Sequence, residues 1–274
     1  MPADPAMRGA RALGALTALG VAAAVLLPAT PQPVEYHDFA DQRRLLGVTN
    51  FLDVASNAGF LLVGLAGMVV ATSRRAVFEH PAERLPYALF FLGVALTAAG
   101  SGWYHLAPDN ERLFWDRLPM TVAFMSLIAA QVAERISLRA GLLLLVPMLL
   151  AGAASVVYWI VSERAGAGNA IPYVVLQAYA VVALLLIAVT RPSRYTRGAD
   201  IYWVLAGYVA AKVLEYFDRE VLELGDLVSG HSLKHLVAAV AAFVVLRMLL
   251  LRTPRHGQND HPAGAAGAED RHRA

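Results

Sequence analysis

The sequence predicts an all-α integral membrane protein, with a bundle of seven transmembrane helices and one additional apolar segment before them. Composition is the first observation: 58% of the 274 residues are apolar and only 16% are charged. Soluble domains average about 45–50% apolar and about 25% charged residues. The second observation is that the apolar residues form runs close to the ~20 residues that a helix needs to cross a bilayer.

The first apolar run, at about residues 12–28, follows a short Arg-bearing start. It is either a retained N-terminal helix or a cleaved signal peptide, and a poor Ala-x-Ala cleavage site favours the helix. The chain is therefore divided into an N-terminal segment (1–32), a helical domain (33–252) and a disordered cytoplasmic tail (253–274). Within the helical domain we expect spans at about residues 50–72, 85–106, 118–134, 139–162, 171–190, 200–217 and 231–251.

The arginines of the short loops predict the orientation of these spans. They gather in alternate connections, and the opposite connections are poorer in arginine, with an acidic one at residues 218–226. Arginine-rich loops stay in the cytoplasm, so both termini are predicted to be cytoplasmic. The Ala- and Arg-rich composition is compatible with a bacterial chain, for which we expect the inner membrane and an outer side that faces the periplasm.

Two features of the composition narrow the chemistry. The chain has no cysteine, which excludes disulfides, thiol nucleophiles and thiolate ligands, so any metal must be held by His, Asp, Glu or water. The formal net charge is only +2. We therefore expect no nucleic-acid partner.

Three of the eight histidines lie on apolar spans, all at predicted outer ends: His105, His231 and His235. His231 and His235 are one helical turn apart on one face and can bind the same metal ion. Three histidines with an open fourth position are typical of catalytic zinc, which lowers the pKa of bound water towards ~7 and polarises carbonyl groups. For His105 alone, the alternative is an ordinary interfacial histidine.

Two further polar residues lie at the same predicted depth. Asp116 could accept a proton from water, or it could cap the helix that begins near it. Ser101 is one turn before His105 and could donate a hydrogen bond to a developing oxyanion, or it could be a small packing residue between two glycines.

Glu215 and Asp218 could hydrogen-bond a ligand imidazole, or they could be solvated charges at a helix end.

The order and spacing of these motifs resemble the alkaline ceramidase family, which are integral-membrane amidases in a wider group of seven-helix hydrolases that includes adiponectin-receptor-like proteins. The motifs that carry the resemblance are Ser101-x-x-x-His105, Asp116, His231-x-x-x-His235 and the segment Asn-Phe-Leu-Asp-Val-Ala-Ser-Asn at residues 50–57. The resemblance extends over about residues 38–251. It implies a ceramidase-type bundle in which the three histidines hold zinc, Asp116 handles protons and Ser101 assists the oxyanion.

The resemblance also implies a calcium site before the first core helix. Asp38, Asp41 and Asn50 stand where the family has oxygen ligands. This chain departs from the family there, because Arg43 replaces an oxygen ligand with a cation and Asn50 replaces a carboxylate.

We therefore predict a zinc-dependent membrane hydrolase that cleaves the amide bond of a membrane lipid such as ceramide, releasing a sphingoid base and a fatty acid. One alternative is a non-catalytic lipid-binding receptor or scaffold with structural zinc, although structural sites normally have four protein ligands. A second is an ester or phospholipid hydrolase that uses the same site. A third is a transporter or a haem-bearing redox protein. The close His231/His235 pair suits one small ion better than haem.

Overall fold

The structure is a computed structural model that describes residues 5–255, and every named element in this range is a helix. The predicted all-α class is therefore confirmed for the described part of the chain. The tail predicted at 253–274 lies, from residue 256 onward, outside the described residues. The helices are α1 (Pro5–Leu26), η1 (Val34–His37), α2 (Phe51–Ser56), α3 (Ala58–Thr72), η2 (Pro81–Glu83), α4 (Arg84–Leu106), α5 (Asn110–Arg135), α6 (Leu138–Arg164), α7 (Ile171–Thr190), α8 (Asp200–Tyr216), α9 (Asp218–Gly225) and α10 (Gly230–Leu251).

Six helical segments of the described chain are long and apolar enough to cross a membrane, and α2 and α3 together form one of them at 51–72. This identifies a multi-pass membrane protein. The apolar part of α1, Arg11–Leu26, is shorter, and α8 has 17 residues. The count of seven core spans plus one therefore remains a prediction.

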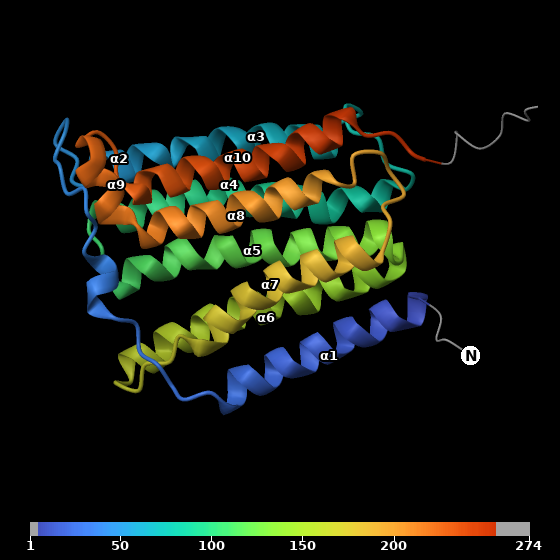
Figure 1. Ribbon diagram of the computed structural model, residues 1–274, viewed down its shortest axis with the longest axis horizontal. Helices are drawn as coiled ribbons and strands as arrows, with labels where there is room; N and C mark the ends of the chain where they lie inside the picture. Colours follow the sequence, from blue (N-terminus) through green and yellow to red (C-terminus); the bar gives the residue numbers. More distant parts are fainter. Residues whose placement is uncertain (1–4, 256–274) are drawn as a thin grey trace, which may run out of the picture.

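The long helices run nearly side by side in one bundle (Figure 1). In this view α3, α10, α4 and α8 lie above α5, and α7, α6 and α1 lie below it. Helix α1 packs along α7, where the Thr17 and Tyr179 hydroxyls are 3.1 Å apart. Helix α1 begins, and α10 ends, at the same end of the bundle (Figure 1).

Helix α5 begins earlier than the span expected from residue 118. Its N-cap is Asp109, whose side chain accepts a hydrogen bond from the Arg112 backbone N–H at 2.7 Å. This bond satisfies a donor that would otherwise be unpaired in the first turn. Asp116 therefore lies inside the helix, and it does not cap it.

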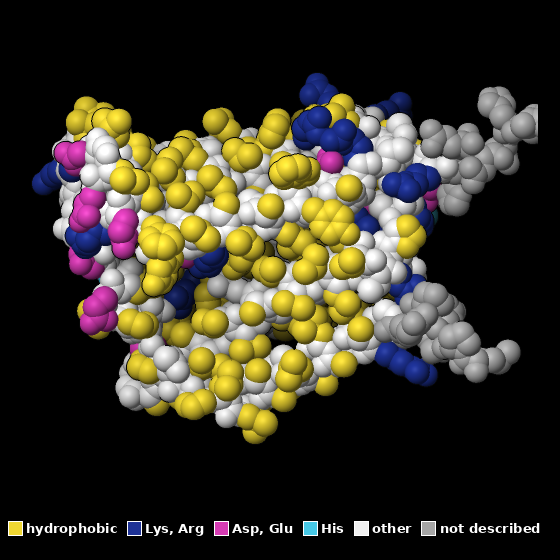
Figure 2. Space-filling model, in the orientation of Figure 1, with side chains coloured by type: hydrophobic (Ala, Val, Ile, Leu, Met, Phe, Trp, Pro, Cys, Tyr) yellow, Lys and Arg dark blue, Asp and Glu magenta, His cyan; other side chains and the backbone are white. Residues whose placement is uncertain are grey.

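Charged side chains separate towards the two ends of the bundle. Figure 2 shows the acidic groups gathered at one end and most basic groups at the other, with an apolar flank between them. At the basic end Arg252 and Glu134 form a fully buried ion pair of 2.8 Å, and Glu134 also accepts a hydrogen bond from Tyr87. This network joins the last turn of α10 to α4 and α5.

Candidate metal centre

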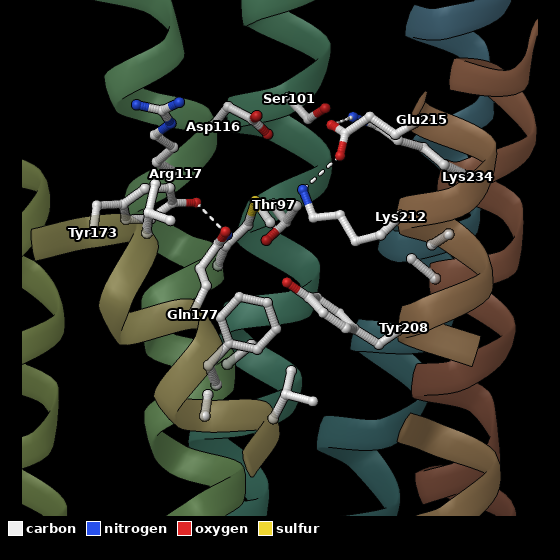
Figure 3. Close-up of a pocket in the computed structure, with 18 of the residues that line it drawn as sticks. Thr97, Ser101, Asp116, Arg117, Tyr173, Gln177, Tyr208, Lys212, Glu215 and Lys234 are labelled. Carbon is white, nitrogen blue, oxygen red and sulfur yellow. Dashed lines mark hydrogen bonds and ion pairs between the residues drawn. The ribbon is translucent and has the colours of Figure 1, made fainter. Parts of the chain in front are cut away.

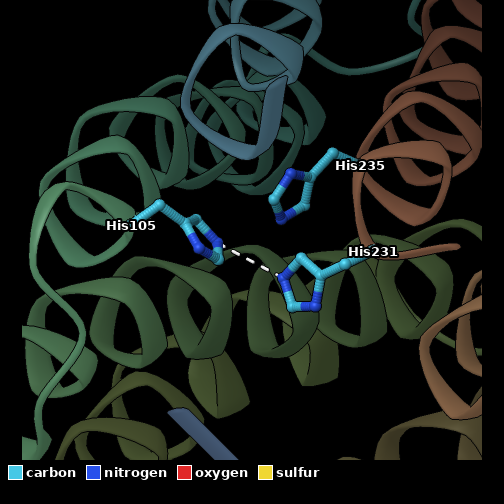
Figure 4. Close-up of side chains that lie close together, drawn as sticks. All are labelled: His105, His231 and His235. Carbon is cyan, nitrogen blue, oxygen red and sulfur yellow. Dashed lines mark hydrogen bonds between the residues drawn. The ribbon is translucent and has the colours of Figure 1, made fainter. Parts of the chain in front are cut away.

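The three histidines predicted as ligands meet at the acidic end of the bundle. His105 comes from the last turn of α4, and His231 and His235 come from the first two turns of α10 (Figure 4). One imidazole nitrogen from each residue lies within 4.8 Å of the other two, and all three side chains are buried. The structure thus brings together residues that are 126 positions apart in the chain.

One pair of these nitrogens has the separation expected around a tetrahedral ion of the size of zinc. With zinc–nitrogen bonds of about 2.0–2.1 Å and tetrahedral angles, two ligand nitrogens lie about 3.3 Å apart. The Nε2 atoms of His105 and His231 are 3.3 Å apart. The three ring centroids are 4.8–5.0 Å apart, so the rings surround one point. The donor set therefore fits a metal ion with three imidazole ligands.

The end of α4, which carries His105, is fixed by the turn before α2. Its last carbonyl groups have no partner within the helix. Asn50 donates from its side-chain amide to the carbonyl of His105 at 2.9 Å, and Thr49 donates to the carbonyl of Leu106 at 2.7 Å. Asn50 has φ +47°, a left-handed conformation that asparagine tolerates better than most residues. These bonds orient the helix end on which the first ligand lies.

The two ligands on α10 are positioned by neighbouring helices. The Nδ1 atom of His235 is 2.8 Å from the Ser56 hydroxyl, which leaves Nε2 for the ion. The backbone N–H of His231 donates to the Asp218 carboxylate at 2.7 Å, and the same carboxylate accepts from the Ala40 N–H. The Asp218 side chain therefore orients the start of α10 by accepting from a backbone N–H of that helix, and it accepts no hydrogen bond from an imidazole. Glu215, the other residue predicted beside a ligand imidazole, accepts hydrogen bonds from Lys212 and Lys234.

The segment of residues 34–41 packs against two of the three histidine rings. The Phe39 ring lies 4.6 Å from the His105 ring and 4.4 Å from the His231 ring, measured between centroids. His37 hydrogen-bonds the Tyr104 hydroxyl at 2.9 Å, and burial lowers the pKa of His37. This segment separates the site from solvent with an aromatic side chain.

The sequence places Asp53 inside the motif at residues 50–57 without assigning it a chemical role, and in the structure it is a fully buried carboxylate on α2. One of its oxygens accepts a hydrogen bond from the Ser232 hydroxyl at 2.6 Å. Ser232 follows the ligand His231 in the sequence. The other oxygen, Oδ2, has no hydrogen-bond partner among the described residues. Its signal in the sequence was a charge inside an apolar span, which is costly in a membrane.

Asp116 and Ser101 come together beside the histidines. Ser101 on α4 and Asp116 on α5 line the same cavity, and Figure 3 shows both side chains in the same part of it. Gly100 makes this approach possible, because a Cβ added there would lie 1.9 Å from the Trp115 carbonyl oxygen on α5. Helices α4 and α5 therefore touch backbone to backbone at the position where the acid and the hydroxyl meet.

These two residues and His235 line a cavity of about 400 Å³. Its polar end carries Asp116, Ser101, Arg117, Lys212, Glu215 and Lys234 (Figure 3). The deeper wall is apolar, and its residues include Phe90, Val94, Leu127, Leu184, Leu205 and Ala242. Figure 2 shows the apolar flank hollowed between α7 and α8, with basic side chains at one edge. The site thus adjoins an amphipathic space between helices.

The residues expected at a calcium site lie at the acidic end of the bundle but have other partners. Arg43 donates to both oxygens of Asp41 at 2.8 Å, and this hydrogen bonding lowers the pKa of Asp41. Gln42 donates to Asp38, and Asn50 binds the His105 carbonyl. A calcium ion would have to displace the guanidinium from Asp41, so calcium binding stays a prediction.

Comparison with protein-family models and with curated proteins finds no match to this chain.

Proposed function

We propose that this protein is a zinc-dependent membrane hydrolase that cleaves the amide bond of a membrane lipid, ceramide being the substrate that the family resemblance implies. The observation that carries the proposal is the buried trio His105, His231 and His235, of which His235 lines one amphipathic cavity together with the acid Asp116 and the hydroxyl of Ser101. Three protein ligands leave a fourth position for water or substrate, which is the arrangement of a catalytic rather than a structural site.

The cavity supports binding of a lipid from the side. Its apolar wall suits an acyl chain, and an amide bound at its polar end would lie near Asp116 and Ser101. When bound, zinc would supply a Lewis acid and lower the pKa of a water molecule towards about 7.

Asp116 is proposed as the general base and then the general acid. It accepts a proton as the water oxygen bonds to the carbonyl carbon, and it returns the proton to the nitrogen as the C–N bond breaks. The products are a fatty acid and a free amine. Ser101 lines the same cavity, and its hydroxyl is proposed to donate to the carbonyl oxygen as charge develops there.

The outer side of the membrane is the proposed location of the site, with both termini in the cytoplasm. Its support is the separation of acidic and basic side chains between the two ends of the bundle (Figure 2). A bacterial inner membrane would place the site on the periplasmic side.

The first prediction tests the proposed acid and ligands in the purified protein. Asp116→Asn should keep zinc but lower the turnover of a lipid amide by about 100-fold or more, because general acid–base catalysis contributes about that much. His231→Ala should lose both zinc and turnover. Zinc is measured by elemental analysis and cleavage by mass spectrometry of the lipid products.

Asp109→Asn is the matched control, since Asp109 caps the same helix and lies outside the cavity. It should keep zinc and activity. Unchanged turnover in Asp116→Asn would end the proposed mechanism. A wild-type protein that holds zinc and cleaves esters but no amides would favour the ester hydrolase, and one that cleaves neither would favour the receptor or scaffold.

A further inference from the structure

One buried cation in the cavity has no acidic partner. The Arg117 side chain is only 5% exposed, and its Nη1 nitrogen has no hydrogen-bond partner within residues 5–255. Its Nη2 nitrogen donates to the neutral side chain of Gln32 at 2.5 Å. No carboxylate of the described chain lies within ion-pair distance of Arg117. Buried charges in proteins are normally paired, so an unpaired guanidinium needs an explanation.

Aromatic rings explain part of how Arg117 remains buried. Its guanidinium carbon lies 4.2 Å from the Trp159 ring centroid, 4.7 Å from that of Tyr173 and 5.6 Å from that of Tyr36. Cation–π contacts stabilise a charge but do not neutralise it. They also hold the planar group in a fixed orientation, with unpaired N–H groups beside the cavity that Arg117 lines.

The other cations of the cavity share a carboxylate. Lys212 and Lys234 each donate to Glu215, at 2.5 and 2.6 Å. Figure 3 shows this trio on one wall of the cavity and Arg117 on another, next to Asp116. The charged residues that line the cavity are three cations, Arg117, Lys212 and Lys234, and two acids, Asp116 and Glu215. The polar end therefore carries one excess positive charge.

We propose that Arg117 binds an anionic group in the head of the substrate, so that the cavity selects amide lipids that carry a carboxylate or phosphate close to the amide over neutral ones. Guanidinium groups bind both anions through paired N–H bonds. Arg117 and Asp116 line the same cavity, so one ligand can place an anion at Arg117 and an amide at Asp116. This inference rests on the proposed function and names the substrate class of that site.

The test compares two lipids that share one acyl chain and one amide. N-oleoylglycine ends in a carboxylate and N-oleoylethanolamine in a neutral hydroxyl group. Binding of each to the purified full chain in a neutral detergent is measured by calorimetry at pH 7.5. Because a hydrogen bond to a charged group is stronger than one to a neutral group, the wild-type protein should bind N-oleoylglycine about 10-fold or more tightly than N-oleoylethanolamine.

Three variants assign the preference to one residue. Arg117→Gln should bind the two lipids about equally, and Arg117→Lys should recover part of the preference because it keeps the charge. Arg112→Gln is the matched control: Arg112 lies on the same helix and stacks on Trp103 with its guanidinium carbon 4.2 Å from the ring centroid, but it is not in the cavity lining. It should keep the full preference.

Several outcomes would overturn the inference. Equal binding of both lipids by the wild type would do so, as would a preference that survives in Arg117→Gln and disappears in Lys212→Gln. Competition by inorganic phosphate alone, as strong as by the lipid, would assign the site to a free anion. Mass spectrometry of the lipid after each titration reports cleavage separately. Selective binding without cleavage would keep the inference and refute the proposed function.

Discussion

At the scale of single residues, the ion pair of Asp41 and Arg43 connects two segments at the acidic end of the bundle. The Asp41 carboxylate is 1% exposed and receives three hydrogen bonds from Arg43, two from the guanidinium and one from the backbone. The same guanidinium also donates to the carbonyls of Asp226 and Leu227, before α10. This pair therefore ties the segment over the metal centre to the loop that leads into the α10 ligands.

The second prediction concerns the pH dependence of the stability that the Asp41–Arg43 ion pair provides. Hydrogen bonds from Arg43 lower the pKa of Asp41 from its ordinary value of 3.8, so folding is stabilised while the group is ionised. That stabilisation is complete above the ordinary pKa and is lost as the pH falls through the lower, folded-state pKa. Asp41→Asn should therefore melt below the wild type at pH 7, and the difference should close as the pH falls below about 4.

Thermal unfolding in detergent at a series of pH values measures this difference. Asp38→Asn is the control, because Asp38 is 62% exposed and its ion pair with Arg219 is long, at 3.4 Å. It should change the melting temperature little at any pH. A difference between Asp41→Asn and wild type that grows on acidification would contradict the prediction.

At the scale of elements, the contact between α4 and α5 determines whether the acid reaches the site. Gly100 faces the Trp115 carbonyl, and Gly93 lets the same two helices approach near Ala123. Small residues of this kind allow close helix packing in membranes. Asp116 and Ser101 meet because these backbones touch.

The third prediction is that Gly100→Ala separates these helices. The added Cβ would lie 1.9 Å from the Trp115 carbonyl oxygen and 2.7 Å from its carbon, so the backbones must move apart. We expect a loss of stability of about 1–3 kcal/mol, as for overpacked cores, together with a loss of turnover. Melting temperature and lipid cleavage are measured on the same preparation.

Gly102→Ala is a close control for this variant. Gly102 lies on the same helix, two residues further on, and an added Cβ there meets nothing within 4 Å. Alanine also favours helix over glycine by about 1 kcal/mol, so this variant should be at least as stable as the wild type. Equal losses in both variants would mean that helix contact at Gly100 is not what positions Asp116.

At the scale of the whole molecule, one end of the bundle holds the candidate site and the other holds the buried network of Arg252 and Glu134. The two ends differ in charge as well as in structure (Figure 2). The arginine distribution predicts that the end with the histidines faces outward.

The fourth prediction tests this orientation, and the absence of cysteine makes the experiment clean. Leu224, on α9 beside the site, is 88% exposed, and Arg75 lies exposed in the loop after α3 at the opposite end. In intact cells a membrane-impermeant maleimide should label Leu224→Cys but not Arg75→Cys, because the reagent does not cross the bilayer. After lysis it should label both. The reverse pattern in intact cells would place the metal centre in the cytoplasm.

The all-α class and most helix limits could be read from the sequence, because hydropathy over about 20 residues is a local property. The spans expected at 171–190 and 231–251 agree with α7 and α10 to within a residue. The start of α5 was placed too late, because charged residues at 110–117 lowered the hydropathy of a turn that is nonetheless capped and helical.

The pairing of His231 with His235 was also local, since a helix places residues i and i+4 on one face. Only the tertiary structure decided that His105 joins them, that Asp218 holds a backbone N–H rather than an imidazole, and that Arg117 has no acidic partner. Each of these depends on contacts between segments far apart in the chain. Spacing along one helix cannot encode such contacts, because they arise from how the helices pack against one another.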